Sequence, residues 1–215
     1  MQFVRQQAIA LAALPLLALA VPTAGLSAQR GPAAPPPHVT FVGDSVSAAI
    51  EYTSAAHARL SRGLVLRLDL KVCRRLVQTG CSYQGATPPT TALQAVDSYG
   101  RSLGDVLIVD VGYNEGSQGY STRIDEIMRA ALRHGVHGVV WVTLRASSAS
   151  SYESIYRSTN TEIKAAARRW PELVVADWNA YGFGKPWFGS DGLHLTSTGA
   201  IALAGFLRPY VFRAA

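Results

Sequence analysis

Two runs that are apolar apart from Asp110 and Thr143 constrain the fold of this chain most strongly. Residues 106–111 read Val-Leu-Ile-Val-Asp-Val, and residues 139–143 read Val-Val-Trp-Val-Thr. A strand with one face in water alternates apolar and polar side chains, whereas a strand that is covered on both faces can be apolar throughout. The two runs therefore predict central strands of a parallel sheet that carries helices on both faces.

The remaining segments alternate between strand and helix patterns around these two runs. A β-strand followed by a helix and a parallel strand forms a right-handed crossover, so this alternation predicts a three-layer α/β/α sandwich with a five-stranded parallel sheet. Residues 178–190 are expected to form a loop. We expect the other strands at residues 38–42, 64–72 and 173–177, and helices at residues 47–60, 91–99, 122–134 and 152–169, with a last helix capped by Thr196 or Ser197.

The amino-terminal residues have the pattern of a secretory signal peptide. Arg5 precedes an uncharged run over residues 8–21 that ends in small residues and proline. We assign residues 1–28 to the signal peptide, with cleavage after Ala20 and alternative sites near Gly25 or Ala28. An uncleaved anchor is the competing interpretation, although the run is short for a membrane span.

A Pro/Ala-rich linker is expected at residues 29–37, and a single domain at residues 38–215. We expect this domain to work outside the cytoplasm as a monomer. Cys73 and Cys81 are the only cysteines. In an exported chain, two nearby cysteines favour a disulfide, with two buried free thiols as the alternative. A zinc site lacks further ligands, and we expect no metal or organic cofactor.

The net charge of +6 comes mostly from scattered arginines. A basic balance can attract nucleic acid, anionic lipid or acidic polymers. The chain has no basic helix and no aromatic RNA-binding motif, so nucleic acid is not an expected partner. The two remaining interpretations are solvated helix faces and a loose association with an anionic cell envelope.

Chemically active residues follow three of the expected strands. Ser45 follows the first strand, Asn114 the third, and Asp191 and His194 the fifth. Functional groups gather at the carboxyl ends of strands in such sheets. An Asp-x-x-His turn lets the carboxylate orient the imidazole, which can then remove the proton from a serine hydroxyl. The sequence therefore predicts a Ser45–His194–Asp191 triad for acyl transfer. The Gly-x-Ser-x-Gly elbow of α/β-hydrolases is absent around Ser45.

These motifs resemble those of the SGNH hydrolases, also called the GDSL esterase/lipase superfamily. The resemblance implies the sheet order 2-1-3-4-5. It also implies that Ser45 is the nucleophile, His194 the general base and acid, Asp191 its orienting group, and Asn114 a donor to the oxyanion. The segments that carry it are Gly43-Asp44-Ser45-Val46, Gly112-Tyr113-Asn114-Glu115 and Asp191-Gly192-Leu193-His194.

The oxyanion hole is expected to contain the Ser45 amide as well as Asn114. In the family that the chain resembles, the amide of a glycine completes this hole, and here we favour Gly85 over Gly80 because Gly85 lies just before the second helix. The effect of Glu115, which stands where that family has aspartate, is not predicted.

Three further residues are expected to lie near the site. Asp44, Tyr113 and Trp187 are candidate substrate contacts. Hydrogen-bonding support is the alternative role for Asp44. Core packing is the alternative for the two aromatic side chains.

We therefore expect a secreted serine esterase that hydrolyses carboxylic esters through an acyl-serine intermediate. Export, basic charge and a resemblance to SGNH domains that lie beside membrane acyltransferases in actinobacteria favour short O-acyl groups on envelope glycans as the substrate. A lipase or thioesterase for longer chains is an alternative, although no long apolar lid is present. Two further alternatives are an acyltransferase with the same triad and a non-catalytic module that binds glycan or lipid.

Overall fold

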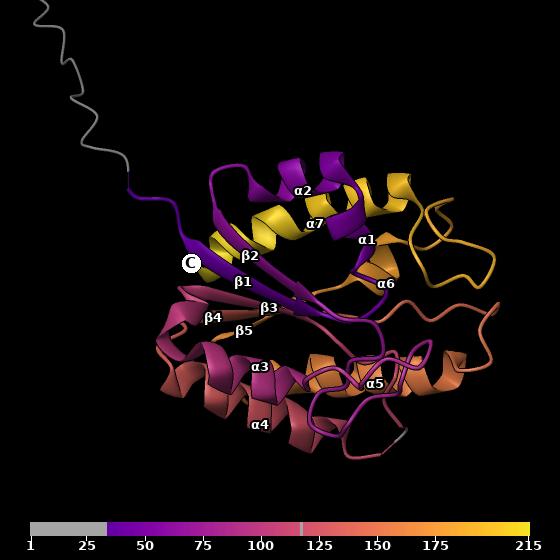
Figure 1. The fold of residues 1–215 in the computed structure, drawn as a ribbon, viewed down its shortest axis with the longest axis horizontal. Helices are drawn as coiled ribbons and strands as arrows, with labels where there is room; N and C mark the ends of the chain where they lie inside the picture. The colour runs from indigo at the N-terminus through magenta and orange to yellow at the C-terminus, as the bar shows by residue number, and fades with distance from the viewer. Residues whose placement is uncertain (1–33, 117) are drawn as a thin grey trace, which may run out of the picture. The chain divides into compact units, whose positions relative to one another are not determined.

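A five-stranded parallel sheet forms the centre of the part of the chain that the computed structural model describes, residues 34–116 and 118–215 (Figure 1). Every neighbouring pair of strands is parallel, and the order is β2-β1-β3-β4-β5, as the resemblance implied. The expected fold class is therefore confirmed. The strands are β1 (His38–Gly43), β2 (Val65–Leu70), β3 (Val106–Asp110), β4 (Gly138–Val142) and β5 (Leu173–Ala176).

Helices cover both faces of this sheet (Figure 1). One layer contains α1 (Ala49–Tyr52), α2 (Ser54–Ser61) and α7 (Ser197–Ala214), and the other contains α3 (Ala92–Tyr99), α4 (Tyr120–Arg133) and α5 (Glu153–Ala166). Two short helices, η1 (Gly100–Leu103) and α6 (Trp178–Tyr181), complete the described elements.

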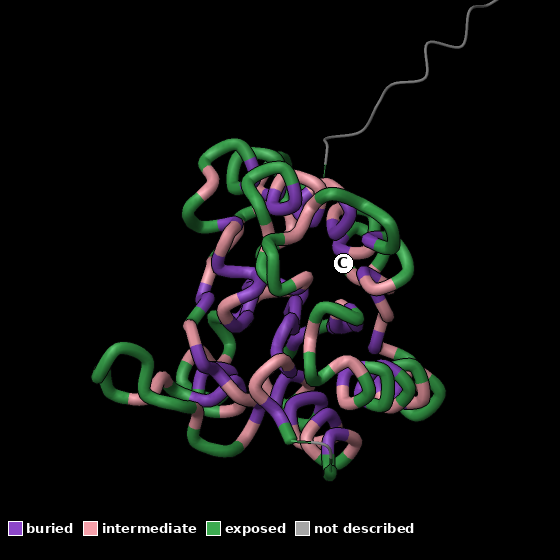
Figure 2. Tube along the Cα trace, turned by 90° about the vertical axis from the view of Figure 1, so that its right-hand side faces the viewer, coloured by how far each residue is buried: buried purple, intermediate pink, exposed green. Residues whose placement is uncertain are grey.

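The two apolar runs of the sequence form the buried centre of the sheet. Every residue of β3 and β4 is buried. Successive side chains of a strand point to opposite faces. Accordingly, Val106 and Ile108 pack with the layer of α2 and α7, whereas Leu107 and Val109 pack with the layer of α3 and α4. Figure 2 shows this buried centre, with exposed segments around it.

The helices differ from the expected ones at two places. The helix expected over residues 47–60 is interrupted at Thr53, whose backbone is extended, with φ of −113° and ψ of 97°. The β-branched side chain of threonine is compatible with this extended conformation. The loop expected at residues 178–190 contains the short helix α6, because the Asp177 side chain accepts a hydrogen bond from Ala180 N at 3.3 Å and caps it.

The other helix starts follow from capping side chains. Thr91 and Gln94 form a reciprocal capping box at the start of α3. Thr196 caps α7 by accepting a hydrogen bond from Gly199 N at 3.1 Å. Of the two residues expected to cap the last helix, Thr196 is therefore the one that does so.

The expected disulfide between Cys73 and Cys81 is present, with a Cα–Cα distance of 5.2 Å. The expected signal peptide, residues 1–28, and most of the linker lie outside the described residues. Within the described part of the chain, no helix combines the length and the apolar character that a membrane crossing requires.

Candidate active site

Ser45 lies in the turn that follows β1, and its neighbour Asp44 anchors this turn. Asp44 is fully buried, and its carboxylate accepts hydrogen bonds from Val46 N at 3.1 Å and from Gly112 N and Tyr113 N at 3.2 Å each. These bonds join the turn after β1 to the turn after β3. Burial keeps Asp44 out of reach of a substrate, so its expected substrate contact is corrected to the supporting role.

Asp191 and His194 lie in one tight turn before α7. The Asp191 carboxylate accepts hydrogen bonds from Leu193 N at 2.9 Å and His194 N at 3.0 Å, and from the His194 Nδ1 at 2.5 Å. Gly192 has a φ of +69°, and a Cβ there would lie 2.2 Å from Ser147 Oγ. Only glycine suits both the left-handed backbone and the close approach.

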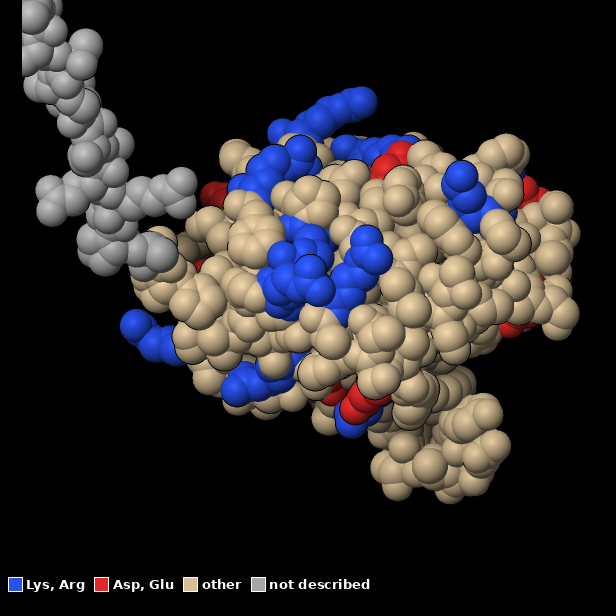
Figure 3. All heavy atoms as spheres, turned by 90° about the horizontal axis from the view of Figure 1, so that it is seen from above, with Lys and Arg blue, Asp and Glu red and all other residues tan. Residues whose placement is uncertain are grey.

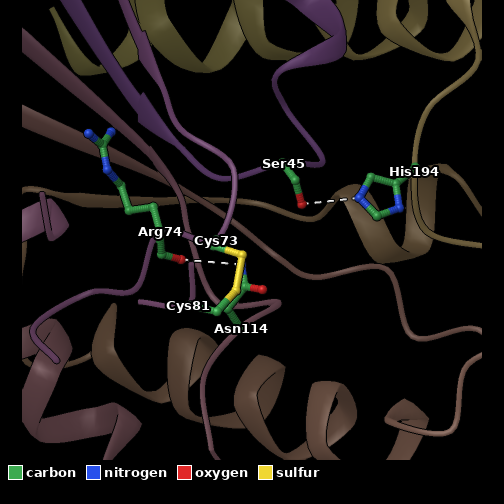
Figure 4. The surroundings of a disulfide bond; sticks show 6 residues. All are labelled: Ser45, Cys73, Arg74, Cys81, Asn114 and His194. Carbon is green, nitrogen blue, oxygen red and sulfur yellow. Dashed lines mark hydrogen bonds between the residues drawn. A yellow bond between two sulfur atoms is a disulfide. The ribbon is translucent and has the colours of Figure 1, made fainter. Parts of the chain in front are cut away.

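The imidazole of His194 connects this turn with Ser45. Its Nε2 lies 3.1 Å from Ser45 Oγ (Figure 4). Because Nδ1 faces a carboxylate, it carries the proton, and Nε2 accepts from the serine hydroxyl. Burial alone would raise the pKa of Asp191, but the hydrogen bonds from the His194 ring and from two backbone N–H groups outweigh it and hold that pKa below its ordinary value. Asp191 therefore remains an anionic acceptor for the imidazole.

Asn114 lies beside Ser45 at the carboxyl end of β3. Its Nδ2 donates a hydrogen bond to the carbonyl oxygen of Arg74 at 3.3 Å (Figure 4). This bond directs the amide nitrogen toward the segment after β2, and the second hydrogen of the Nδ2 group donates to no other described residue. Asn114 can therefore donate to a reacting carbonyl oxygen.

Ser45, Asn114 and His194 line one cavity of about 410 Å³. Six of the other lining residues were not predicted from the sequence, and Cys73 was predicted only as a disulfide partner. The six are Ala48, Ala49, Tyr52, Val72, Tyr83 and Leu195. Tyr52 ends α1, which follows Ser45, and Tyr83 follows Cys81 in the segment after the second strand. Both segments leave the carboxyl end of a strand, and this position in the sequence was the signal that could have identified them. The complete lining is Ser45, Ala48, Ala49, Tyr52, Val72, Cys73, Tyr83, Asn114, His194 and Leu195.

Besides Asp44, three further sequence candidates do not line this cavity. Gly85 is exposed, with a φ of +77°, and no other atom lies within 4 Å of where a Cβ on it would stand, so nothing in the geometry supports its expected role as an oxyanion donor. Tyr113 accepts a hydrogen bond from Arg145 N through its hydroxyl, at 2.6 Å, and packs edge-on against Tyr156. Trp187 stacks on Trp178, with ring centroids 5.6 Å apart. For both aromatic residues the alternative of structural packing fits better than substrate contact.

Glu115, whose role was left open, does not line the cavity. Its buried carboxylate accepts a hydrogen bond from Leu76 N at 2.5 Å and pairs with Arg123 at 2.7 Å and Arg75 at 3.7 Å. Since Leu76 belongs to the segment after β2, Glu115 connects that segment to the turn that carries Asn114.

A second carboxyl group lies beneath the site. Asp110 is 1% exposed, and neither of its carboxyl oxygens has a hydrogen-bond partner among the described residues, although Ser47 lies nearby. Burial raises the pKa of Asp110 well above its ordinary value, and repulsion from the Asp44 carboxylate adds to the shift. Burial also raises the pKa of Asp44, to about 6, against three backbone hydrogen bonds that favour its anion. At neutral pH these shifts favour the charge on Asp44 and the proton on Asp110.

A larger cavity of about 650 Å³ lies elsewhere, between α2 and α7. Its lining includes Arg59, Arg62 and Arg208 and no acidic residue. Lys and Arg side chains gather on this side of the molecule (Figure 3). The cavity contains none of the triad residues, so size alone does not identify the reactive site. We name it the basic groove.

No group of three or more His, Cys, Asp or Glu side chains that could hold a metal ion occurs within residues 34–116 and 118–215. The donor atoms of the site are those of a serine, an imidazole, a carboxylate and an amide. This set suits nucleophilic acyl transfer.

Comparison with known proteins found no match to a protein family profile and none to a curated protein sequence. Solved structures do match. The C-terminal catalytic domain of the Streptococcus pneumoniae peptidoglycan O-acetyltransferase OatA is 19% identical, with a TM-score of 0.61 over 82% of this chain and 91% of that one. The esterase EstA of Pseudoalteromonas is 12% identical, with a TM-score of 0.59 over 82% and 96%.

A variant of Axe2, an acetyl-xylooligosaccharide esterase from Geobacillus, is 13% identical, with a TM-score of 0.52 over 80% of this chain and 93% of that one. These likenesses show that the chain has the fold of the SGNH hydrolases, as its three motifs predicted. At such identities the likeness extends to the fold, and the function has to be argued from the site.

The buried proton on Asp110 predicts a pH-dependent stability. The unfolded chain releases this proton near the ordinary pKa of aspartate, whereas the folded chain retains it. Stability therefore falls as the pH rises above about 4, by up to about 1.4 kcal/mol per pH unit for one proton. Asparagine does not titrate in this range, so Asp110→Asn abolishes this pH dependence. The free energy of unfolding of the variant, relative to that of the wild type, should therefore increase between pH 5 and pH 8.

Urea unfolding at several pH values measures this difference. Glu51→Gln, at an exposed carboxyl on α1, is the control and should give the same pH profile as the wild type. Parallel profiles for Asp110→Asn and the wild type would contradict the assignment of the proton.

Proposed function

We propose that this protein is a serine esterase that hydrolyses carboxylic esters through a covalent acyl-Ser45 intermediate. The observation that carries the proposal is the continuous contact from Ser45 Oγ to His194 Nε2 at 3.1 Å and from His194 Nδ1 to Asp191 Oδ2 at 2.5 Å. A serine hydroxyl needs such a base to become a nucleophile, and the base needs a carboxylate to hold its tautomer.

The reaction then proceeds in two displacement steps. Ser45 Oγ attacks the ester carbonyl carbon while His194 Nε2 takes the hydroxyl proton, and the resulting oxyanion accepts hydrogen bonds from the Ser45 amide and Asn114 Nδ2. When the tetrahedral intermediate collapses, His194 returns the proton to the departing alcohol. Water then attacks the acyl-serine, His194 accepts its proton, and the acid leaves as Ser45 recovers its proton. Asp191 stays anionic throughout.

Short O-acyl groups on a glycan are the substrate class that we favour. The cavity beside Ser45 has a volume of about 410 Å³, and six of its ten lining residues are alanine, valine, leucine or tyrosine. Tyr52 and Tyr83 line it and are 78% and 53% exposed. Exposed aromatic rings beside a cavity offer flat apolar faces against which a sugar ring can pack. The fold is shared with a peptidoglycan O-acetyltransferase domain and an acetyl-xylooligosaccharide esterase.

We also propose that the protein is exported, works as a monomer and associates loosely with the anionic cell envelope. The disulfide supports an oxidising compartment. The basic groove supports the association. Arg208 donates hydrogen bonds to the carbonyl oxygens of Arg59, Leu60 and Arg62, whereas Arg59 and Arg62 have exposed side chains without a carboxylate partner among the described residues. These two arginines are available to an acidic polymer.

The triad predicts the effect of removing the nucleophile. Ser45→Ala should lower turnover of p-nitrophenyl esters by about 10⁴-fold or more, because no other hydroxyl contacts His194 Nε2 among the described residues. Release of p-nitrophenol is measured for acetyl through palmitoyl esters, and circular dichroism checks that the variant folds. Ser61→Ala, at the far end of α2, is the matched control and should retain activity.

The chain-length profile separates the alternatives. A maximum at acetyl supports the glycan esterase, and a maximum at longer chains would favour a lipase or thioesterase. Transfer of the acyl group to a sugar acceptor in preference to water would indicate an acyltransferase. Glycan binding without turnover, unchanged in Ser45→Ala, would contradict the esterase and favour a binding module.

The two exposed tyrosines predict a difference between small and glycan substrates. Replacing Tyr52 and Tyr83 by Ala should raise KM for an O-acetylated oligosaccharide about tenfold more than KM for p-nitrophenyl acetate, since only the first has sugar rings to pack. Phe212→Ala, an exposed aromatic change on α7, serves as the control. An equal effect on both substrates would argue against sugar packing at these positions.

The basic groove predicts the salt dependence of binding to a polyanion. The double variant Arg59→Glu and Arg62→Glu should elute from immobilised dextran sulfate at a clearly lower salt concentration than the wild type, because charge attraction to the groove is lost. The double variant Arg129→Glu and Arg133→Glu on α4 changes the net charge equally on the other helix layer and should shift elution less. Equal shifts would indicate that net charge alone controls binding.

A further inference from the structure

Three donors were expected in the oxyanion hole, and the third of them, Gly85, is not at the cavity. Ser45 and Asn114 line the cavity, but Gly85 does not. We propose that the main-chain N–H of Cys73 is the remaining oxyanion donor and that the Cys73–Cys81 disulfide holds it in place, so that ester hydrolysis depends on the oxidised disulfide. This inference rests on the proposed function.

The position of Cys73 supports this role. Cys73 lies three residues after β2 and lines the cavity together with Ser45, Asn114 and His194. In Figure 4 the disulfide overlaps Asn114 and lies near the Ser45–His194 pair. Between β2 and α3, the described residues that line the cavity are Val72, Cys73 and Tyr83.

The backbone of Cys73 has an unusual conformation. Its φ is +63°, in the left-handed region that residues with a Cβ rarely adopt. Among the described residues, Gln84 is the only other non-glycine residue with positive φ. Strained backbone conformations persist where the surrounding structure enforces them, and they concentrate at functional sites. The unusual backbone conformation of Cys73 is therefore consistent with a functional role at the cavity that it lines.

The amide of Cys73 also lacks an acceptor within the described part of the protein. Arg74 N donates to Lys71 O at 3.2 Å, but Cys73 N and Ser45 N donate no hydrogen bond to a described residue. Cys73 is 7% exposed. Buried N–H groups are almost always paired in native proteins. Two such amides beside one nucleophile are the donors that a developing oxyanion needs.

Several contacts fix the segment that carries this amide. The carbonyl oxygen of Arg74 accepts the Asn114 hydrogen bond, and the fully buried Arg74 guanidinium pairs with Asp69 at 2.9 Å and donates to Thr90 O at 3.0 Å. Glu115 accepts from Leu76 N at 2.5 Å. These bonds hold the residues that follow Cys73.

The disulfide restrains Cys73 itself, and Gly80 allows the close packing of the loop against it. A Cβ on Gly80 would lie 2.0 Å from the carbonyl oxygen of Cys73, so only glycine allows this close approach. Cys81, the next residue, closes the bond to Cys73. Gly80, the alternative to Gly85 in the sequence analysis, therefore allows the position of Cys73 but is not itself the proposed donor. Reduction by a dithiol, which adds two electrons and two protons to give two thiols, removes this restraint.

A pair of double variants tests the proposal. Glycine adopts positive φ without strain, so Cys73→Gly with Cys81→Ser should keep the amide in place without a disulfide, whereas Cys73→Ala with Cys81→Ser should not. We expect the alanine variant to lose about 10²- to 10³-fold in kcat for p-nitrophenyl acetate with little change in KM, the effect of losing one oxyanion donor. The glycine variant should stay within about tenfold of the wild type.

Dithiothreitol provides a second readout. It should lower the kcat of the wild type, with thiol labelling to confirm reduction, and leave the glycine variant unaffected. Thermal melting of each protein separates lost activity from lost folding. Equal activity of the two double variants, whether both high or both low, would overturn the inference, and so would a reduced wild type that is folded and fully active.

The wild type and Ser45→Ala are assayed first. If no ester is hydrolysed in a Ser45-dependent manner, the proposed function fails and this inference fails with it. If the wild type is active and the alanine variant is equally active, only the role of Cys73 fails.

Discussion

The parallel pairing of β1 with both β2 and β3 is the constraint on which the candidate site depends. Gly43, the last residue of β1, lies opposite Leu70 of β2 and Asp110 of β3. Because the three strands end level with one another, the segments that follow them emerge side by side at one edge of the sheet. Ser45, Cys73 and Asn114 come from these three segments. Only His194 and Asp191 have to reach the edge from a longer connection, and their turn is stabilised by its own hydrogen bonds.

Buried polar side chains hold the three segments in position. Asp44 accepts from the turn after β3, Glu115 accepts from the segment after β2, and Arg74 ties that segment to Asp69. Burying charged groups costs free energy, and a paired buried charge adds little net stability compared with an apolar core. Its advantage here is geometric, since each pair allows only a narrow range of backbone positions. The edge that carries the candidate site is therefore held by directional bonds, whereas the sheet below it is held by apolar packing.

The fold was predictable because it follows from patterns that are local in the sequence. The apolar runs that form β3 and β4, and the Thr91 and Thr196 caps, needed no information about distant residues. The break at Thr53 was not predictable in this way, because alanine-rich residues on both sides favour helix. The helix α6 was missed for a similar reason. It is only four residues long, and its cap on Asp177 depends on where β5 ends.

The sequence by itself determined the class of sheet and indicated the disulfide partners and the residues of the proposed triad, because strand periodicity and a turn of four residues are short-range properties. The tertiary structure alone decided which other groups meet the triad. It buried Asp44, stacked Trp187 on Trp178, left Gly85 exposed, and brought Cys73, Tyr52 and Tyr83 to the cavity. These placements depend on sheet register and on contacts between segments tens of residues apart. No local pattern encodes such contacts, since their free energy arises only when the packed layers bring the segments together.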